Sequence, residues 1–243
     1  MLDYAKKSLM AFTKGYPQQP VIYYGLRGVG KTVLLNAIEK RADDLDILYT
    51  HIEVAEKRSF IAQLANASKK TIYRMSTVEK AKTLAKRAIG IVQAFTLTYN
   101  PEDQTISAGW SEPSPYITTG VLSEDLTDMF VNMGNLAAKT ENVICFFIDE
   151  IQYMKDDEME ALVNALHRVN QLRLPIIIFG AGLPKVLKIL GEVKSYAERL
   201  FKYIEVAELP NDAAREAICR PAEDFNVTYT DEAVNEILNW TKG

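Results

Sequence analysis

Cysteine and histidine are scarce in this sequence. Only two cysteines occur in 243 residues, Cys145 inside an apolar run and Cys219 on a predicted helix. Two isolated thiols form neither a disulfide framework nor a cysteine metal site. The two histidines, His51 and His167, are far apart in the sequence, so a zinc centre is not expected either. We therefore expect the fold to depend on an apolar core.

Long apolar segments and a strong excess of one charge are also missing. No apolar run approaches the roughly 20 residues that are needed to span a bilayer, and the N-terminus, Met-Leu-Asp-Tyr-Ala-Lys-Lys, lacks the apolar segment of a secretory signal. The formal net charge of −4 gives no global reason to expect nucleic-acid binding. With 48% apolar residues, the composition indicates a cytoplasmic protein of one large domain, or of one domain and part of a second.

The most informative segment lies near the start of the chain and has the sequence GLRGVGKT. Its spacing is that of a phosphate-binding loop, which must follow a buried strand and open a helix. Both flanks comply. The apolar run 21–24 indicates a strand, and apolar residues at helical spacing indicate a helix that begins at about Lys31. The residues of the loop are Gly25, Leu26, Arg27, Gly28, Val29, Gly30, Lys31 and Thr32.

The residue types of this loop suit a phosphate group. Glycine lets the main chain adopt conformations that a Cβ forbids, so successive N–H groups can turn inward around an anion. The N-terminus of the following helix adds free donors and partial positive charge. We expect Lys31 to reach the β- and γ-phosphates of a nucleotide and the Thr32 hydroxyl to ligate Mg²⁺. The alternative is a glycine-rich turn with a solvated Lys31, which requires the spacing and both flanks to coincide by chance.

A second chemical signal follows the apolar run 143–148, which ends in Asp149 and Glu150. An unbroken apolar run of this length is typical of a strand buried on both faces of a parallel sheet. Ligands of such sheets lie at the carboxyl ends of the strands, where these two acids emerge. Asp149 can hold Mg²⁺ directly or through water, and Glu150 can polarise the water that attacks the γ-phosphate. The alternative is a strand followed by a capping acid.

Strands and helices alternate along the rest of the chain. Apolar runs at 47–54 and 174–180 predict two further strands, and helical spacing predicts helices over 123–139 and from about 156. Ser123 is the predicted cap of the first of these helices. The alternation predicts an α/β fold with three layers and a mostly parallel sheet.

The segment from about 56 to 121 is predicted to be an insertion. Residues 56–87 indicate helix, while alternating large side chains over 95–99 and a second run over 105–110 predict a β-hairpin. The helical part holds nine basic residues and two acids. This excess indicates a surface for nucleic acid or an acidic partner, or else an ordinary solvated helix face. The basic residues are Lys57, Arg58, Lys69, Lys70, Arg74, Lys80, Lys82, Lys86 and Arg87.

Together the two signals resemble the AAA+ ATPases, in particular the prokaryotic branch related to origin-recognition and replication-initiator ATPases. GLRGVGKT is similar to the Walker A motif of that family, and ICFFIDE is similar to its Walker B motif. The resemblance implies a three-layer P-loop NTPase fold with ATP and Mg²⁺ as ligands. It also implies that Arg199 is an arginine finger, which acts on ATP bound to a neighbouring subunit of a homo-oligomer. The alternative is an arginine paired on a helix surface.

The sequence departs from that family in two places. The family usually carries a polar phosphate sensor near the end of its fourth strand, but residues 179–182 are Phe-Gly-Ala-Gly, which favours slow hydrolysis. Residues 211–220 and 230–241 look like the first helices of the family's helical lid, and a lid needs more helices than these. We therefore expect a nucleotide-binding core over 1–209 and the start of a truncated lid over 210–243.

Two functions follow as hypotheses. The first is an ATPase in which hydrolysis drives rearrangement of the lid or of an oligomer. The second is a slow-hydrolysing, nucleotide-dependent switch that recruits a partner, for example DNA. A small-molecule kinase is a third alternative, but the sequence contains no arginine-rich cluster of the kind that the lid of such an enzyme requires.

Overall fold

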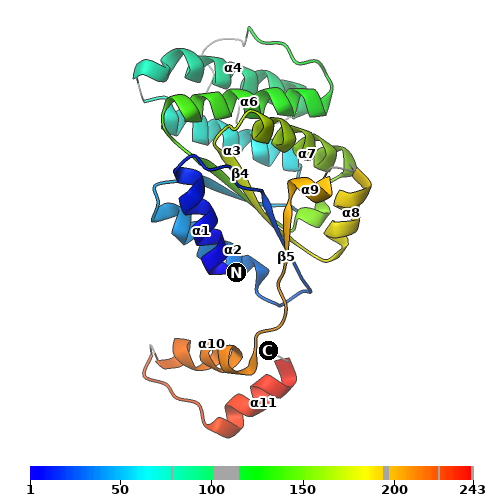
Figure 1. The fold of residues 1–243 in the computed structure, drawn as a ribbon. Helices are drawn as coiled ribbons and strands as arrows, with labels where there is room; N and C mark the ends of the chain where they lie inside the picture. The colour runs from blue at the N-terminus through cyan, green and yellow to red at the C-terminus, as the bar shows by residue number, and fades with distance from the viewer. Residues whose placement is uncertain (78, 101–114, 194–196, 224, 242–243) are drawn as a thin grey trace.

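The computed structural model describes residues 1–77, 79–100, 115–193, 197–223 and 225–241 (Figure 1). At its centre lies one parallel sheet of five strands in the order β2-β3-β4-β1-β5. The strands are β1 Val21–Tyr24, β2 Leu48–Glu53, β3 Ile144–Asp149, β4 Ile176–Gly182 and β5 Lys202–Glu205. Every residue of β3 and β4 is buried, as expected of strands covered on both faces. The prediction of an α/β fold with a parallel sheet is confirmed.

Helices cover both faces of the sheet. Because successive side chains of a strand point to opposite faces, the core consists of two apolar clusters, one on each face of the sheet. Val21 and Tyr23 belong to the cluster formed with α1 and α2, whereas Ile22 belongs to the cluster formed with the helices of the other face (Figure 1). The first face carries α1 Leu2–Thr13 and α2 Lys31–Asp43. The second carries α3 Phe60–Met75, α4 Lys82–Tyr99, α6 Leu122–Lys139, α7 Asp156–Gln171 and α8 Lys185–Val193. The three predicted layers are therefore present.

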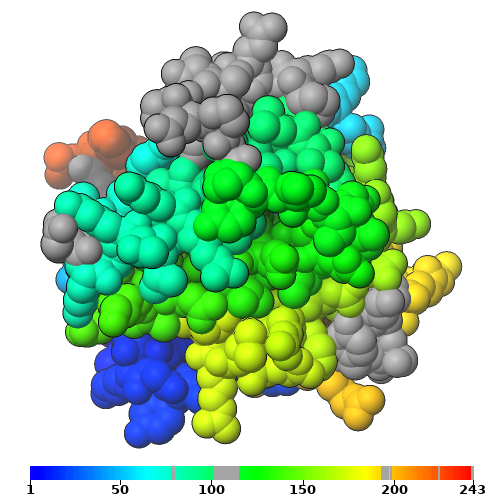
Figure 2. Space-filling view, turned by 90° about the horizontal axis from the view of Figure 1, so that it is seen from above, coloured from blue at the N-terminus to red at the C-terminus, as the bar shows by residue number. Residues whose placement is uncertain are grey.

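The segment between β2 and β3 extends the second face outward. A short 3₁₀ helix, Glu79–Ala81, joins α3 to α4, and α4 packs against both α3 and α6. Seen from above, α4 and α6 lie side by side across the outer surface of the molecule (Figure 2). The predicted helix over 56–87 corresponds to α3 and the start of α4, which a turn after Met75 separates.

The first strand of the predicted β-hairpin is wrong, because Phe95–Tyr99 forms the last turns of α4. Phe95 is fully buried and lies one helical turn from the fully buried Val92, whereas Leu97 is 54% exposed. The Thr96 hydroxyl donates to the Val92 carbonyl at 2.8 Å, as helical threonines do. Packing of α4 against α3 and α6 therefore favours a helix here, although the alternating large side chains favour a strand. The second predicted strand, 105–110, lies outside the described residues.

The predicted cap of α6 is also wrong. The helix begins after Val121, one residue earlier than expected, and Ser123 does not cap it. Instead the carboxylate of Asp125 reaches back and accepts hydrogen bonds from the main-chain N–H groups of Thr119 at 2.8 Å and Gly120 at 3.1 Å. It also accepts the Tyr99 hydroxyl at 2.5 Å, which ties the end of α4 to the start of α6. A buried carboxylate thus organises the turn that a surface serine was expected to organise.

The chain beyond β5 forms two helices, α10 Asn211–Glu223 and α11 Asp231–Thr241, which lie together beyond the carboxyl end of β5 (Figure 1). Arg215 joins them by donating to Asp231 and Asn235, both at 2.7 Å. The boundary between core and lid near residue 209 stays a prediction. Within the described part of the chain, no helix has the length and apolar character that crossing a membrane requires.

Candidate functional site

The glycine-rich loop connects β1 to α2 at the carboxyl edge of the sheet. Gly30 precedes the helix with a left-handed backbone, at φ 86° and ψ 20°, and Gly28 has a φ of 87°. Side chains with a Cβ rarely adopt this conformation, so the turn requires glycine here. Gly25 is required for a different reason, because a Cβ on it would lie 2.2 Å from the carbonyl oxygen of Val206. The loop is therefore shaped by main-chain geometry.

Lys31 lies inside this loop and is only 7% exposed. Its Nζ donates to the carbonyl oxygens of Leu26 at 2.6 Å and Gly25 at 3.0 Å. These bonds hold the ammonium group beside the main chain that forms the loop, at the N-terminus of α2. Since both the helix terminus and the ammonium group attract anions, the loop concentrates positive charge at one point.

Thr32 and Asp149 meet, although they come from different elements. The Thr32 hydroxyl donates to Asp149 Oδ2 at 2.5 Å, and the Glu150 main-chain N–H donates to Asp149 Oδ1 at 2.8 Å. Asp149 ends β3 and is 3% exposed. Both of its oxygens therefore have partners, which fixes the carboxylate against the start of α2. A hydroxyl and a carboxylate at this position are oxygen donors of the kind that Mg²⁺ prefers.

Glu150 follows directly and begins the turn that leaves the sheet. Its φ is 54°, an uncommon value for a residue with a side chain, and it precedes the 3₁₀ helix Ile151–Tyr153. Its carboxylate accepts a hydrogen bond from Gln152 Nε2. Glu150 also lines a hollow of about 750 Å³ together with Gly28, Lys31 and Thr32. The two sequence signals therefore share one cavity.

The hollow has further walls that the sequence analysis did not include. Tyr153 lines the hollow and accepts a hydrogen bond from the loop residue Arg27 at 2.9 Å. Lys185 is not part of the lining, and its Nζ lies 5.3 Å from the centre of the Tyr153 ring. Glu53 ends β2 and pairs in register with Asp149. Glu53 could have been found, because it closes a predicted parallel strand and such strand ends meet at one edge. Tyr153 and Lys185 carry no comparable signal in the sequence.

Arg199 does not reach this hollow. It lies on the four-residue helix α9, Ala197–Leu200, which precedes β5 and therefore stands at the amino edge of the sheet. Its carbonyl oxygen accepts a hydrogen bond from Gln19 Nε2 at 2.9 Å, and its side chain is exposed. Any action of Arg199 on a nucleotide in such a hollow thus requires a second copy of the chain.

The basic residues between β2 and β3 do not line the same hollow, apart from Lys57. Lys80 pairs with Glu141 at 3.3 Å on the surface. Arg87 lines a groove of about 570 Å³ between α4 and α6, where Asp128 also contributes. The charge of this groove is therefore mixed, and nucleic-acid binding by this segment stays a prediction.

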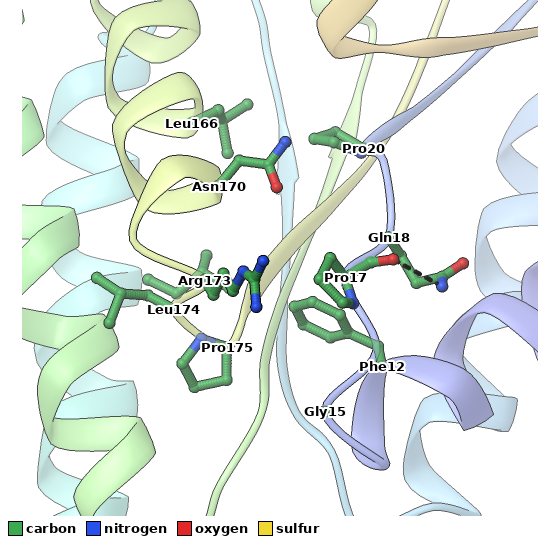
Figure 3. A pocket seen from close by; sticks show the side chains of 11 residues that line it. Phe12, Gly15, Pro17, Gln18, Pro20, Leu166, Asn170, Arg173, Leu174 and Pro175 are labelled. Atoms are coloured by element: carbon green, nitrogen blue, oxygen red, sulfur yellow. Dashed lines mark hydrogen bonds between the residues drawn. The ribbon is translucent and has the colours of Figure 1, made fainter.

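A smaller cavity of about 50 Å³ lies at the amino edge of the sheet (Figure 3). Pro20 and Pro175, which precede β1 and β4, form part of its wall with Phe12 and Arg173. Ligand pockets in proteins usually measure about 300–1,000 Å³. This cavity is too small for a nucleotide and lies at the opposite edge from the loop.

The fold is similar to that of several solved structures. A DNA replication initiation factor aligns with a TM-score of 0.54 and 16% identity over 98% of this chain, and the replication initiator DnaA bound to AMPPCP and single-stranded DNA aligns with 0.53 and 14% over 97%. Cdc6p from Pyrobaculum aerophilum aligns with 0.52 and 12% over 89%. The chain spans about half the length of each, 54%, 54% and 47%. At these identities the likeness concerns the fold.

A comparison with curated proteins gave no match. A family model described as the AAA ATPase domain matches residues 9–179, which is more than half of the chain. The match includes the glycine-rich loop, the end of β3 and most of β4. The resemblance that the sequence predicted is thereby confirmed: the chain belongs to the AAA ATPase domain family.

Proposed function

We propose that this chain binds ATP with Mg²⁺ and hydrolyses it to ADP and phosphate. The observation that carries the proposal is the 2.5 Å contact between Thr32 and Asp149. It joins the first turn of the helix behind the loop to the acidic end of β3, so that phosphate donors and metal-binding oxygens border one hollow. The AMPPCP bound by the similar DnaA structure supports a nucleotide as the ligand.

The phosphates are expected to bind to the loop. Main-chain N–H groups of residues 26–32, at the N-terminus of α2, would supply donors that carry no side-chain entropy cost. Lys31 adds a charged donor from its buried position within the loop. To reach a phosphate, Lys31 would exchange its hydrogen bonds to the Gly25 and Leu26 carbonyls for bonds to phosphate oxygens.

The metal is expected to bind beside the loop. Thr32 and Asp149 are the residues that would hold Mg²⁺, which usually takes one or two protein oxygens and completes its shell with water and phosphate oxygens. Within the described residues, no group of three or more His, Cys, Asp or Glu side chains could hold a metal without a ligand's help. The bound ion would neutralise the charge of the phosphate oxygens.

Glu150 is proposed to orient the attacking water. Its carboxylate accepts a hydrogen bond from a water molecule, whose oxygen forms a bond to the γ-phosphorus as the bond from that phosphorus to the β,γ-bridging oxygen breaks. The products are ADP and inorganic phosphate, and the proton of the water leaves through the carboxylate or solvent. Glu150 lines the hollow and directly follows Asp149, the proposed metal ligand, which supports this role.

Arg199 is proposed to act on the nucleotide of a neighbouring copy. Its exposed position at the amino edge of the sheet leaves it free to meet another subunit. An arginine that enters a site from a neighbour stabilises the charge of the transition state. ATP turnover per chain should then rise with protein concentration and fall in Arg199→Ala, and a turnover that depends on neither would remove this residue from the mechanism.

The decisive experiment compares ATP turnover and ATP binding in the unmutated chain, in Glu150→Gln and in Glu141→Gln. Glu150→Gln should keep its affinity for ATP and lose about 10²–10⁴-fold in turnover, the usual contribution of a positioned base. Glu141 is the matched control, because it precedes β3 at the opposite edge and its side chain forms an exposed ion pair with Lys80. Equal turnover in both variants would reject the role of Glu150. If the unmutated chain binds ATP without hydrolysing it, the ATPase proposal fails and the nucleotide-dependent switch takes its place.

A further inference from the structure

Gln152 is a buried amide with a partner at each end. It lies two residues after Glu150 in the 3₁₀ helix and is 4% exposed. Its Nε2 donates to Glu150 Oε2, and its Oε1 accepts the main-chain N–H of Leu183 at 2.9 Å. A carboxylate can only accept and an N–H can only donate, so these partners define the orientation of the amide. Gln152 thus connects Glu150 to the residue that follows β4.

The end of β4 is shaped to receive this amide. A Cβ on Gly182 would lie 2.6 Å from Gln152 Oε1 and 2.9 Å from Ile151 Cγ2. A real Cβ atom essentially never lies this close to another heavy atom, so a side chain at position 182 would displace Gln152. The lack of a polar side chain at the end of β4 therefore has a structural explanation: an amide from the neighbouring turn occupies the space that such a side chain would need.

Glu150 is consequently held at two points. Its main-chain N–H donates to Asp149 Oδ1 at 2.8 Å, and its side chain is bound by Gln152. The left-handed backbone of Glu150 directs the chain out of the sheet, and without a partner its carboxylate would sample several rotamers. With Oε2 engaged by Gln152, Oε1 is the oxygen available to accept a water molecule.

We propose that Gln152 is a positioning residue for ATP hydrolysis, which holds the Glu150 carboxylate at a fixed place relative to the end of β4. This inference rests on the proposed function, because it concerns the orientation of the group that is proposed to activate water. The amide of Gln152 thereby joins the acidic turn after β3 to the main chain at the end of β4.

A structural role for Gln152 alone would give a different result from a positioning role. A buried glutamine that only joins two elements affects the stability of the fold and every activity in parallel. A positioning residue affects kcat and leaves nucleotide binding unchanged, because it acts on a group that contributes to the transition state and contributes little to the ground state.

The test replaces Gln152 by Met, which keeps the length of the side chain and removes the amide. Gln152→Met should lower kcat about 10- to 100-fold, the usual cost of losing the partner of a functional group, while KM and the affinity for Mg·AMPPCP stay within about threefold. Gln93→Met is the matched control, because Gln93 is 8% exposed and lies on α4 away from the hollow. It should retain the kcat of the unmutated chain. A Gln152→Met variant with unchanged kcat, or with binding lost in parallel, would overturn the proposal.

A double-mutant cycle adds a second criterion. Once Glu150→Gln has removed the carboxylate, adding Gln152→Met should cause no further loss of turnover, and a full multiplicative loss would show that Gln152 acts independently of Glu150.

If Gln152→Met melts below the assay temperature, Gln152→Asn replaces it, since its shorter amide cannot span both partners, and the same two outcomes decide. If the unmutated chain does not hydrolyse ATP, the proposed function itself fails. If it does, and Glu150→Gln is inactive while Gln152→Met is fully active, only the present inference fails.

Discussion

The glycine-rich loop and the end of β3 face the same hollow, yet they are built in different ways. The loop occupies eight consecutive residues, and its shape comes from main-chain angles at Gly28 and Gly30. The end of β3 depends on groups from three separate places, namely the side chains of Thr32 and Gln152 and the main-chain N–H of Leu183 after β4. The conformation of the loop therefore depends mostly on local geometry, whereas the orientation of the acidic pair needs the assembled sheet.

This difference predicts two patterns of sensitivity. Substitutions in the loop should change binding of the nucleotide, because the loop supplies donors to the ground state. Substitutions around Asp149 and Glu150 should change metal dependence and turnover, because those groups are proposed to act on the metal and on water. The following predictions test this division, starting with the largest effect.

Lys31→Ala should lower the affinity for ATP by about 100-fold or more, since removing one partner of a buried charge pair usually costs about 2–5 kcal/mol. Isothermal titration calorimetry with AMPPCP measures the affinity without turnover. Lys40→Ala, which alters an exposed lysine in the last turn of the same helix, is the control and should bind like the unmutated chain. An affinity that Lys31→Ala leaves intact would remove the loop from phosphate binding.

Asp149→Asn should reduce the dependence on Mg²⁺. Asparagine keeps the size of the side chain and one oxygen, but it loses the negative charge that attracts the ion. In the presence of Mg²⁺ we expect nucleotide affinity to fall about 10- to 100-fold, the range found for the loss of groups that support metal sites. With Mg²⁺ chelated, the variant and the unmutated chain should bind equally. An equal loss of nucleotide affinity with and without Mg²⁺ would contradict a metal role for Asp149. It would also mean that the end of β3 affects nucleotide binding in the same way as the loop.

Gly30→Ala should weaken binding by main-chain strain alone. A Cβ at this position meets nothing within 4 Å, but φ is 86°, so the cost comes from the left-handed conformation and amounts to about 1–2 kcal/mol. Gly15 is a matched control, because it has a φ of 81° and equally open surroundings and lies after α1, remote from the loop. Urea unfolding should show a similar loss of stability in both alanine variants, and only Gly30→Ala should also bind ATP more weakly. Equal binding by the two would show that the loop tolerates a Cβ.

Tyr153→Phe should have the smallest effect of the four. The hydroxyl accepts one hydrogen bond, from the loop residue Arg27, and a typical net contribution of about 0.5–1.5 kcal/mol corresponds to a change of roughly two- to tenfold. Because this bond joins the loop to the turn after β3, both KM and kcat should change slightly. Tyr229→Phe, at an exposed tyrosine, is the control and should change neither. A change confined to kcat would assign Tyr153 to the acidic pair alone.

Much of the fold could be predicted because burial on both faces leaves a clear pattern. The runs that became β1, β3 and β4 are apolar without interruption, and the face of α6 formed by Leu126, Met129 and Phe130 is fully covered as its spacing indicates. The errors occurred where local and tertiary preferences conflict. Phe95, Leu97 and Tyr99 alternate like a strand, yet contacts with α3 and α6 make them helical.

The site divides in the same way. The loop could be read residue by residue, since its function depends on spacing between neighbours in the chain. Gln152 could not be identified, because its importance comes from Leu183 and Gly182, about thirty residues further along. The sequence showed that residues 179–182 lack a polar side chain, but only the packing of the 3₁₀ helix Ile151–Tyr153 against the end of β4 revealed what occupies that space.

By itself, the sequence determined that this chain has a glycine-rich loop between a strand and a helix, a strand that ends in two acids, and an α/β order of elements. These features are local, because they follow from backbone freedom, hydrophobic periodicity and the positions of charged residues along the chain. Only the tertiary structure decided that Thr32 meets Asp149, that Arg199 stands at the other edge of the sheet, and that Gln152 holds Glu150. Those contacts depend on strand order and close packing, which join residues that the chain itself keeps far apart.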